Sequence, residues 1–142
     1  MFRTILAAID GSKTSTEALE QAIGEAKRWS ADLHVVYVVE TGLFSSIPMD
    51  NTWEVIYGLL EKEGQDALSA ARQTAKAVDV EITTHMRQGR AGNEIIRLGE
   101  ELGADLIVMG AHGKSNIDRL LIGSVSSHVV KYSPITTMVV RS

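Results

Sequence analysis

The sequence predicts an α/β fold: a doubly wound, five-stranded parallel sheet with helices on both faces. Strand-like and helix-like segments alternate along the 142 residues, which is typical of parallel strands joined by right-handed crossovers. Several of the strand segments are nearly continuous apolar runs, as strands covered on both faces are. Neither an internal repeat nor a linker divides the chain, so we expect one domain over residues 1–142.

The first three elements follow from local patterns. Residues 5–9 are a short apolar run that ends at Asp10, which favours a buried strand. Thr14 and Glu17 have the spacing of a capping box and predict the start of a helix, which apolar residues at helical spacing continue. Residues 33–39 are rich in β-branched side chains and predict the second strand.

The middle of the chain contains a long loop, a long helix and a third strand. Residues 41–52 are rich in Gly, Ser, Pro, Asp and Asn, which favours a loop. Helical spacing returns over residues 53–78. Residues 80–86 alternate between apolar and polar side chains, which predicts a strand with one more exposed face. A turn at 89–92 then leads into a third helix, which Gly103 is placed to end.

The last part of the chain repeats the strand–helix order. Residues 105–109 predict a fourth strand, because an apolar run follows Asp105, and this strand ends at Gly110. A loop over residues 111–122 follows. The fourth helix is expected to begin near Ser124, and residues 136–140 predict the last strand.

Composition excludes several functions. The formal net charge is −4, whereas binding to a phosphate backbone needs a basic surface, so we expect no nucleic-acid partner. The chain has no cysteine, which rules out disulfides, thiol catalysis and cysteine-ligated zinc. No apolar stretch approaches the ~20 residues of a membrane span, and no secretory signal opens the sequence. We therefore expect no membrane partner and a cytoplasmic location.

Two turns are candidates for a ligand site, because ligands of such sheets bind at the carboxyl ends of the strands. The first turn begins at Asp10, and the second contains Gly110 and Gly113. Glycines let a ligand approach the backbone and permit positive φ. Gly123 and Ser124 stand where the last helix begins, and the N–H groups and dipole of a helix start favour an anion.

Together these features predict a phosphate-binding loop. The Ser124 hydroxyl is a further donor, and Lys114 and Arg119 in the intervening loop could neutralise phosphate charge. The alternative is that the glycines only shape a turn and start a helix, as glycines do in many loops.

The sequence does not contain the other common nucleotide-binding motifs or the motifs of most enzyme classes. Gly113-Lys114-Ser115 resembles the end of a Walker loop, but Val108 stands where the first glycine of that motif is required. The three-glycine dinucleotide fingerprint is absent after the first strand. The sequence shows no general base and no nucleophile motif, so a dedicated enzyme is not expected. Slow ATP hydrolysis stays open, because positioning and charge carry most of phosphoryl transfer.

The spacing of Gly110, Gly113, Gly123 and Ser124 resembles the nucleotide-binding motif of the universal stress protein family, in its ATP-binding branch. The resemblance covers the whole chain and is carried by residues 8–12, 104–110, 119–126 and 133–141. It implies a Rossmann-like fold related to the adenine-nucleotide α-hydrolases, with strand order 3-2-1-4-5. It also implies a stress-response protein that binds ATP and Mg²⁺.

The resemblance assigns roles to individual residues. Asp10 would lie near the ribose, the triphosphate and the metal, and it is the one metal ligand expected. The adenine site would be lined by Ala8, Ile9 and Val38, the last through its backbone, with Val39 as the alternative alignment. The phosphates would be held by Gly110, Gly113, Gly123, Ser124 and Val125.

The position of Asp10 favours ligand binding independently of the resemblance, since a carboxylate at the end of a strand can accept hydrogen bonds from ribose hydroxyls or ligate magnesium. The alternative for Asp10 is the N-cap of the following helix.

Three functions are therefore open: a nucleotide-binding regulatory protein, a weak ATPase of the α-hydrolase-like group, and a nucleotide-independent dimeric interaction module. In the implied strand order, residues 136–140 form an uncharged edge strand, which predicts a homodimer by antiparallel pairing with a second copy. The alternative is that the 41–52 loop of the same chain covers that edge.

Overall fold

Five parallel strands form one sheet in the order β3-β2-β1-β4-β5 in the computed structural model of this chain, which describes residues 1–44, 51–112 and 123–141. The predicted fold class and strand order are confirmed. The strands are β1 (Thr4–Ile9), β2 (Asp32–Glu40), β3 (Ile82–Gly89), β4 (Leu106–Gly110) and β5 (Thr137–Val140).

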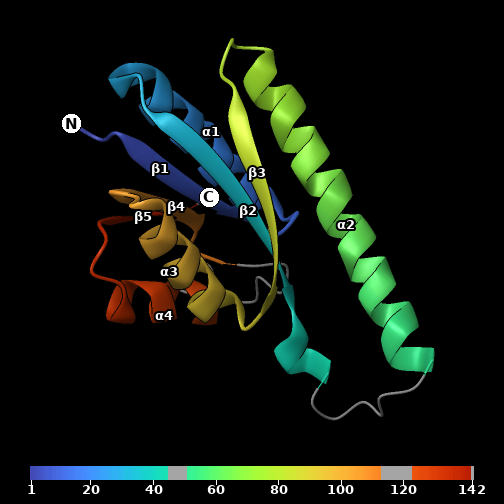
Figure 1. The fold of residues 1–142 in the computed structure, drawn as a ribbon. Coiled ribbons are helices and arrows are strands. Elements are labelled where there is room, and N and C mark those ends of the chain that lie inside the picture. The colour runs from blue at the N-terminus through green and yellow to red at the C-terminus, as the bar shows by residue number, and fades with distance from the viewer. Residues whose placement is uncertain (45–50, 113–122, 142) are drawn as a thin grey trace.

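Helices cover both faces of this sheet, as Figure 1 shows. They are α1 (Lys13–Trp29), α2 (Asn51–Lys76), α3 (Ala91–Leu102) and α4 (Ser124–Tyr132), with a short 3-10 helix, η1 (Thr41–Phe44), after β2. Helices α1 and α2 lie on one face, and α3 and α4 lie on the other. None of the described helices is both long and apolar enough to span a membrane.

The sheet separates two hydrophobic cores. Successive side chains of a strand point to opposite faces, so Ile5 of β1 packs beneath α1, while its neighbour Leu6 packs beneath α3. Both side chains are fully buried. Along β2 the same alternation sends Val35 to the α1 side and Val36 to the α3 side.

The start of α1 differs from the prediction. The helix begins at Lys13, and its N-cap is Ser12, whose Oγ accepts a hydrogen bond from the backbone N–H of Ser15 at 3.1 Å. The predicted capping box at Thr14 and Glu17 is therefore wrong. The positive φ of Gly11, 83°, turns the chain at the end of β1 so that Ser12 reaches the helix start first.

Other boundaries shift by a few residues. Strand β3 ends at Gly89 instead of residue 86, because its pairing with β2 continues to the last pair, Gly89 and Glu40. Helix α3 ends as predicted, with Gly103 in the left-handed conformation at φ 65°.

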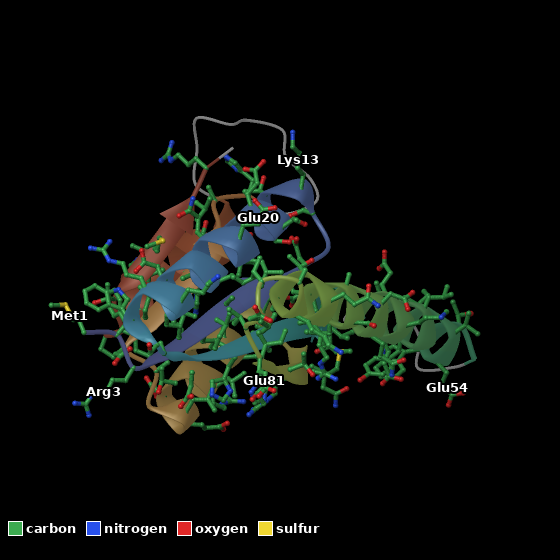
Figure 2. The ribbon with its side chains drawn as sticks, turned by 90° about the horizontal axis from the view of Figure 1, so that it is seen from above. Met1, Arg3, Lys13, Glu20, Glu54 and Glu81 are labelled. Carbon is green, nitrogen blue, oxygen red and sulfur yellow. The ribbon has the colours of Figure 1, made fainter. Side chains whose placement is uncertain are left out.

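Helix α2 projects beyond the sheet at its N-terminal end, where Glu54 lies far from the strands in Figure 2. Gly64 lets the middle of α2 approach the sheet, since a Cβ at this position would lie 2.6 Å from Cδ1 of Tyr37. A glycine that weakens the isolated helix thus permits close contact between α2 and β2.

Candidate functional site

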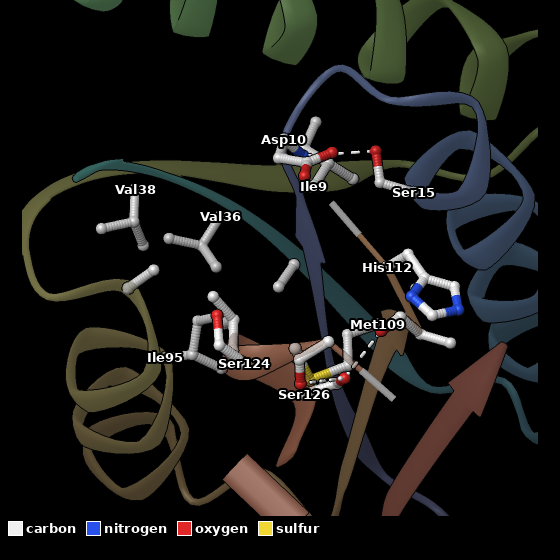
Figure 3. A pocket seen from close by; sticks show the side chains of 16 residues that line it. Ile9, Asp10, Ser15, Val36, Val38, Ile95, Met109, His112, Ser124 and Ser126 are labelled. Atoms are coloured by element: carbon white, nitrogen blue, oxygen red, sulfur yellow. Dashed lines mark hydrogen bonds between the residues drawn. The ribbon is translucent and has the colours of Figure 1, made fainter. Parts of the chain in front are cut away.

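A cavity of about 370 Å³ lies at the carboxyl ends of the central strands (Figure 3). It is bounded by the ends of β1, β2 and β4 and by the first turns of α3 and α4. This is the point at which the winding of the sheet reverses, where doubly wound folds bind their ligands. Its size is within the range of small-molecule sites, about 300–1,000 Å³.

Eight of the nine residues predicted for a nucleotide site line this cavity. Strands β1 and β2 contribute Ala8, Ile9 and Val38, and Asp10 directly follows β1. The end of β4 and the start of α4 contribute Gly110, Gly123, Ser124 and Val125. Gly113, Lys114 and Arg119 lie outside the described residues. The structure thus brings together two turns that are about a hundred positions apart in the sequence.

One side of the cavity is apolar. Val36 and Val38 of β2, Ile95 of α3 and Met109 of β4 line it, and Figure 3 shows both valines and Ile95 on the side opposite His112. Val36, Ile95 and Met109 were not singled out in the sequence. Of these, Val36 could have been found from Val38, because residues two apart on a strand share a face.

The side chains of the two alternatives at the end of β2 lie on opposite faces of the sheet, while the contact through the backbone stays a prediction. Val38 lines the cavity and packs with the α3 core. Val39 is buried in the opposite core, beneath α1 and α2. Only Val38 therefore presents its side chain to the cavity.

Asp10 stands at the end of β1 with a partly exposed side chain. Its Oδ1 accepts a hydrogen bond from the backbone N–H of Ser12 at 2.9 Å, and its own N–H donates to Oγ of Ser15 at 3.2 Å. The alternative role of Asp10 as an N-cap does not hold, because Ser12 caps α1. The carboxylate instead stabilises the turn after β1 through its hydrogen bond with Ser12, and Asp10 lines the cavity.

The described residues contain no group of three or more His, Cys, Asp or Glu side chains arranged to hold a metal. Asp10 thus supplies one carboxylate. A single carboxylate fits Mg²⁺ that is bound mainly through substrate phosphates and water, and it does not fit a metal held entirely by protein.

The first turn of α4 is fastened to the end of β4 through one carbonyl group. The oxygen of Ala111 accepts hydrogen bonds from the backbone N–H of Gly123 at 2.6 Å and from Oγ of Ser126 at 2.9 Å. Ser124 follows with an exposed side chain, and the N-cap, Gly123, has no side chain to cap the helix. This positions the positive end of the α4 dipole at the cavity.

The glycines of the motif play a different physical part from the one predicted. Gly123 has φ −69°, and Gly110 is not among the residues with positive φ. A Cβ at Gly123 would lie 2.8 Å from the oxygen of Ala111, and one at Gly110 would lie 2.8 Å from Cγ2 of Thr14. Neither glycine therefore uses the positive φ that glycine permits. Both make room for the protein's own chain, and the predicted approach of a ligand to their backbone stays a prediction.

The other two helix starts near the cavity already have a capping group. Ser12 caps α1, and Glu40, the last residue of β2, serves α3. Oε2 of Glu40 accepts a hydrogen bond from the backbone N–H of Ala91 at 2.7 Å, and Oε1 accepts one from Gly42 at 3.2 Å. Among the described residues, no side chain caps α4 in this way.

His112 completes the polar side of the cavity. Its Nε2 is buried and has no hydrogen-bond partner among the described residues. His112 is thus a residue of the cavity lining that has a buried imidazole nitrogen.

Comparison with known proteins gives a consistent result. Residues 1–141 match the universal stress protein family. Universal stress protein MJ0531 of Methanocaldococcus jannaschii is 39% identical over 141 residues, which cover 99% of this chain and 83% of that protein.

Solved structures show the same similarity. Protein MJ0577 superposes with a TM-score of 0.87 at 25% identity, over 100% of this chain and 97% of that one. A universal stress protein solved in complex with cAMP superposes with a TM-score of 0.70 at 26% identity, over 99% and 97% of the two chains.

Proposed function

Because this chain belongs to the universal stress protein family, we propose that its residues 1–142 form one nucleotide-binding domain that regulates a stress response in the cytoplasm. The proposed ligand is ATP with Mg²⁺, as expected for the ATP-binding branch of the family. The observation that carries the proposal is the cavity, which has an apolar side formed by β2, α3 and β4 and an uncapped helix start on its polar side.

The capping groups determine how a nucleotide would lie. The carboxylate of Glu40 already occupies the start of α3, so an anion there would meet negative charge. The start of α4 offers backbone N–H groups, a positive dipole end and the exposed Ser124 hydroxyl. We therefore orient the phosphates toward α4 and the flat apolar base toward Val36 and Val38.

Asp10 is the proposed magnesium and ribose contact. With Oδ1 engaged by Ser12, Oδ2 is the oxygen that we expect to face the ligand. When bound, the ion would neutralise phosphate charge, while the protein holds it through this one carboxylate. The relative solved with cAMP supports an adenine nucleotide as the ligand class.

A charge reversal at Ser124 tests the phosphate position. Ser124→Asp puts a carboxylate where the phosphates are proposed to lie, so ATP affinity measured by calorimetry should fall at least tenfold. Folding should not suffer, because an acidic residue favours the first turn of a helix. Ser127→Asp is the matched control, since Ser127 is also exposed on α4 but does not line the cavity. Equal ATP affinity in both variants would exclude the proposed orientation.

Nucleotide binding itself has a direct test. Protein purified without added nucleotide should yield adenine nucleotide on extraction. ATP at 100 times its dissociation constant should stabilise the fold by ~2.7 kcal/mol. If millimolar ATP with Mg²⁺ produces neither heat nor thermal stabilisation, the nucleotide-independent interaction module becomes the better proposal.

Hydrolysis is the second candidate activity. The titratable side chains in the described lining are Asp10 and His112, so a weak ATPase would depend on one of them. Turnover of labelled ATP that is lost in Asp10→Asn or His112→Gln would favour this alternative. Stoichiometric binding without turnover favours the regulatory protein.

We also propose a homodimer through β5. This strand pairs with β4 on one side and forms an edge of the sheet. Of the 41–52 segment, η1 contacts β3 at the other edge of the sheet. Light scattering should give the mass of two chains, and Val139→Lys should reduce it to one. A dimer that survives this substitution would place the interface elsewhere.

A further inference from the structure

Two histidines meet on neighbouring strands, outside the cavity. Nδ1 of His34 on β2 lies 2.9 Å from Nε2 of His85 on β3. The ring centroids are 5.2 Å apart, and the ring planes differ by 29°. Neither residue lines the cavity. The proposed nucleotide function therefore leaves this pair unexplained.

The strand register holds the two rings in place. His34 pairs with Thr83, and His85 pairs with Val36, so the histidines are diagonal neighbours on one face of a hydrogen-bonded ladder. Both side chains are half-buried, so solvent reaches them while the sheet restricts their backbone. The pair is thus both accessible and preorganised.

We propose that His34 and His85 form a binding site for a divalent transition-metal ion, with Cu²⁺ bound more tightly than Ni²⁺ or Zn²⁺. Neutral imidazole is a ligand that these ions share, and first-row affinities reach their maximum at copper. The proposal does not depend on nucleotide binding.

The nitrogen separation fits two ligands of one ion. Imidazole nitrogens bind at about 2.0–2.1 Å, so two of them at right angles around an ion lie about 2.9 Å apart. In the hydrogen-bonded pair, one of the two facing nitrogens carries a proton. On metal binding that ring would move its proton to its other nitrogen, so that both lone pairs face the ion and no net proton is released.

Water would occupy the remaining positions, since the described residues provide no cluster of three or more ligands. The charged groups nearby are Arg87, two residues along β3 from His85, and Glu101 of α3, with which Arg87 forms an ion pair. Their charges oppose each other, so the pair of imidazoles is not surrounded by net positive charge. An ion bound there would join β2 to the edge strand β3.

Calorimetry on tag-free, nucleotide-free protein tests the site. Titration with Cu²⁺ in a weakly coordinating buffer should show one ion per chain, and Ni²⁺ and Zn²⁺ should bind more weakly. His34→Gln and His85→Gln should each reduce Cu²⁺ affinity at least tenfold. His128→Gln is the matched control, because the His128 ring packs against Tyr132 with the ring planes 47° apart, while His34 and His85 are the histidines that pair among the described residues. This variant should bind Cu²⁺ as the wild type does. Equal affinity in all four proteins would overturn the proposal.

Two measurements on the wild type do not depend on the folding of any variant. Cu²⁺ at 100 times its dissociation constant should raise the folding equilibrium constant by up to about 100-fold, since binding to histidines of the unfolded chain reduces the effect. Ni²⁺ at substoichiometric amounts should broaden the amide resonances around His34 and His85 before those around His112 and His128. Broadening that begins at His112 or His128 would refute the assignment.

Discussion

Gly123→Ala should destabilise the protein even when no nucleotide is present. The added Cβ would lie 2.8 Å from the oxygen of Ala111 and 3.4 Å from Cα of His112, and backbone atoms there cannot rotate away. Overpacking of this kind costs about 1–3 kcal/mol. A shift of α4 would also weaken the two hydrogen bonds that the Ala111 carbonyl accepts, each worth about 1 kcal/mol. We expect a total loss of about 1–3 kcal/mol, because the chain will relieve the clash partly by giving up hydrogen-bond geometry.

Differential scanning calorimetry of the nucleotide-free protein measures this cost. At roughly 2–4 °C per kcal/mol for a domain of this size, Tm should fall by about 2–12 °C. Gly24→Ala is the matched control, since Gly24 is exposed on α1 and a Cβ there meets nothing within 4 Å. It should gain about 0.5–1 kcal/mol. A Gly123→Ala protein with wild-type Tm but no ATP binding would refute the reasoning, because the glycine would then make room for ligand and not for backbone.

Three further perturbations test other parts of the fold. Leu98→Ala in the α3 core, where Leu98 is fully buried, should cost about 2–5 kcal/mol in urea unfolding. Asp105→Ala removes a carboxylate that accepts backbone N–H bonds at the start of β1 and should cost about 1–3 kcal/mol by the same assay. Burial, then the neighbouring His34 and Arg87, lower the pKa of His85 from its ordinary 6.5, against a smaller opposing effect of Glu101. The unfolded chain therefore takes up this proton before the folded one does, so stability should be complete above pH ~6.5 and fall below it, with a slope that is smaller in His85→Gln.

Local patterns in the sequence were enough to predict the order of elements. Apolar runs and helical spacing report which side of an element meets a core, and this is a property of neighbouring residues. The same holds for Gly103, whose place after an apolar helix predicted its left-handed C-cap. The predicted N-cap of α1 was wrong because two hydroxyl residues that can cap a helix, Ser12 and Thr14, lie close together in the sequence. The turn at Gly11 places Ser12 at the start of the helix.

The sequence by itself thus determined the fold class, the family and half of the residues that line the candidate site, since a glycine motif and the ends of strands can be recognised along the chain. The tertiary structure decided how these parts are used. Glu40 caps α3 across 51 positions, and His34 meets His85 across the same separation. The reason is physical: such contacts depend on the register between strands and on backbone packing between distant segments, and no local pattern encodes either of them.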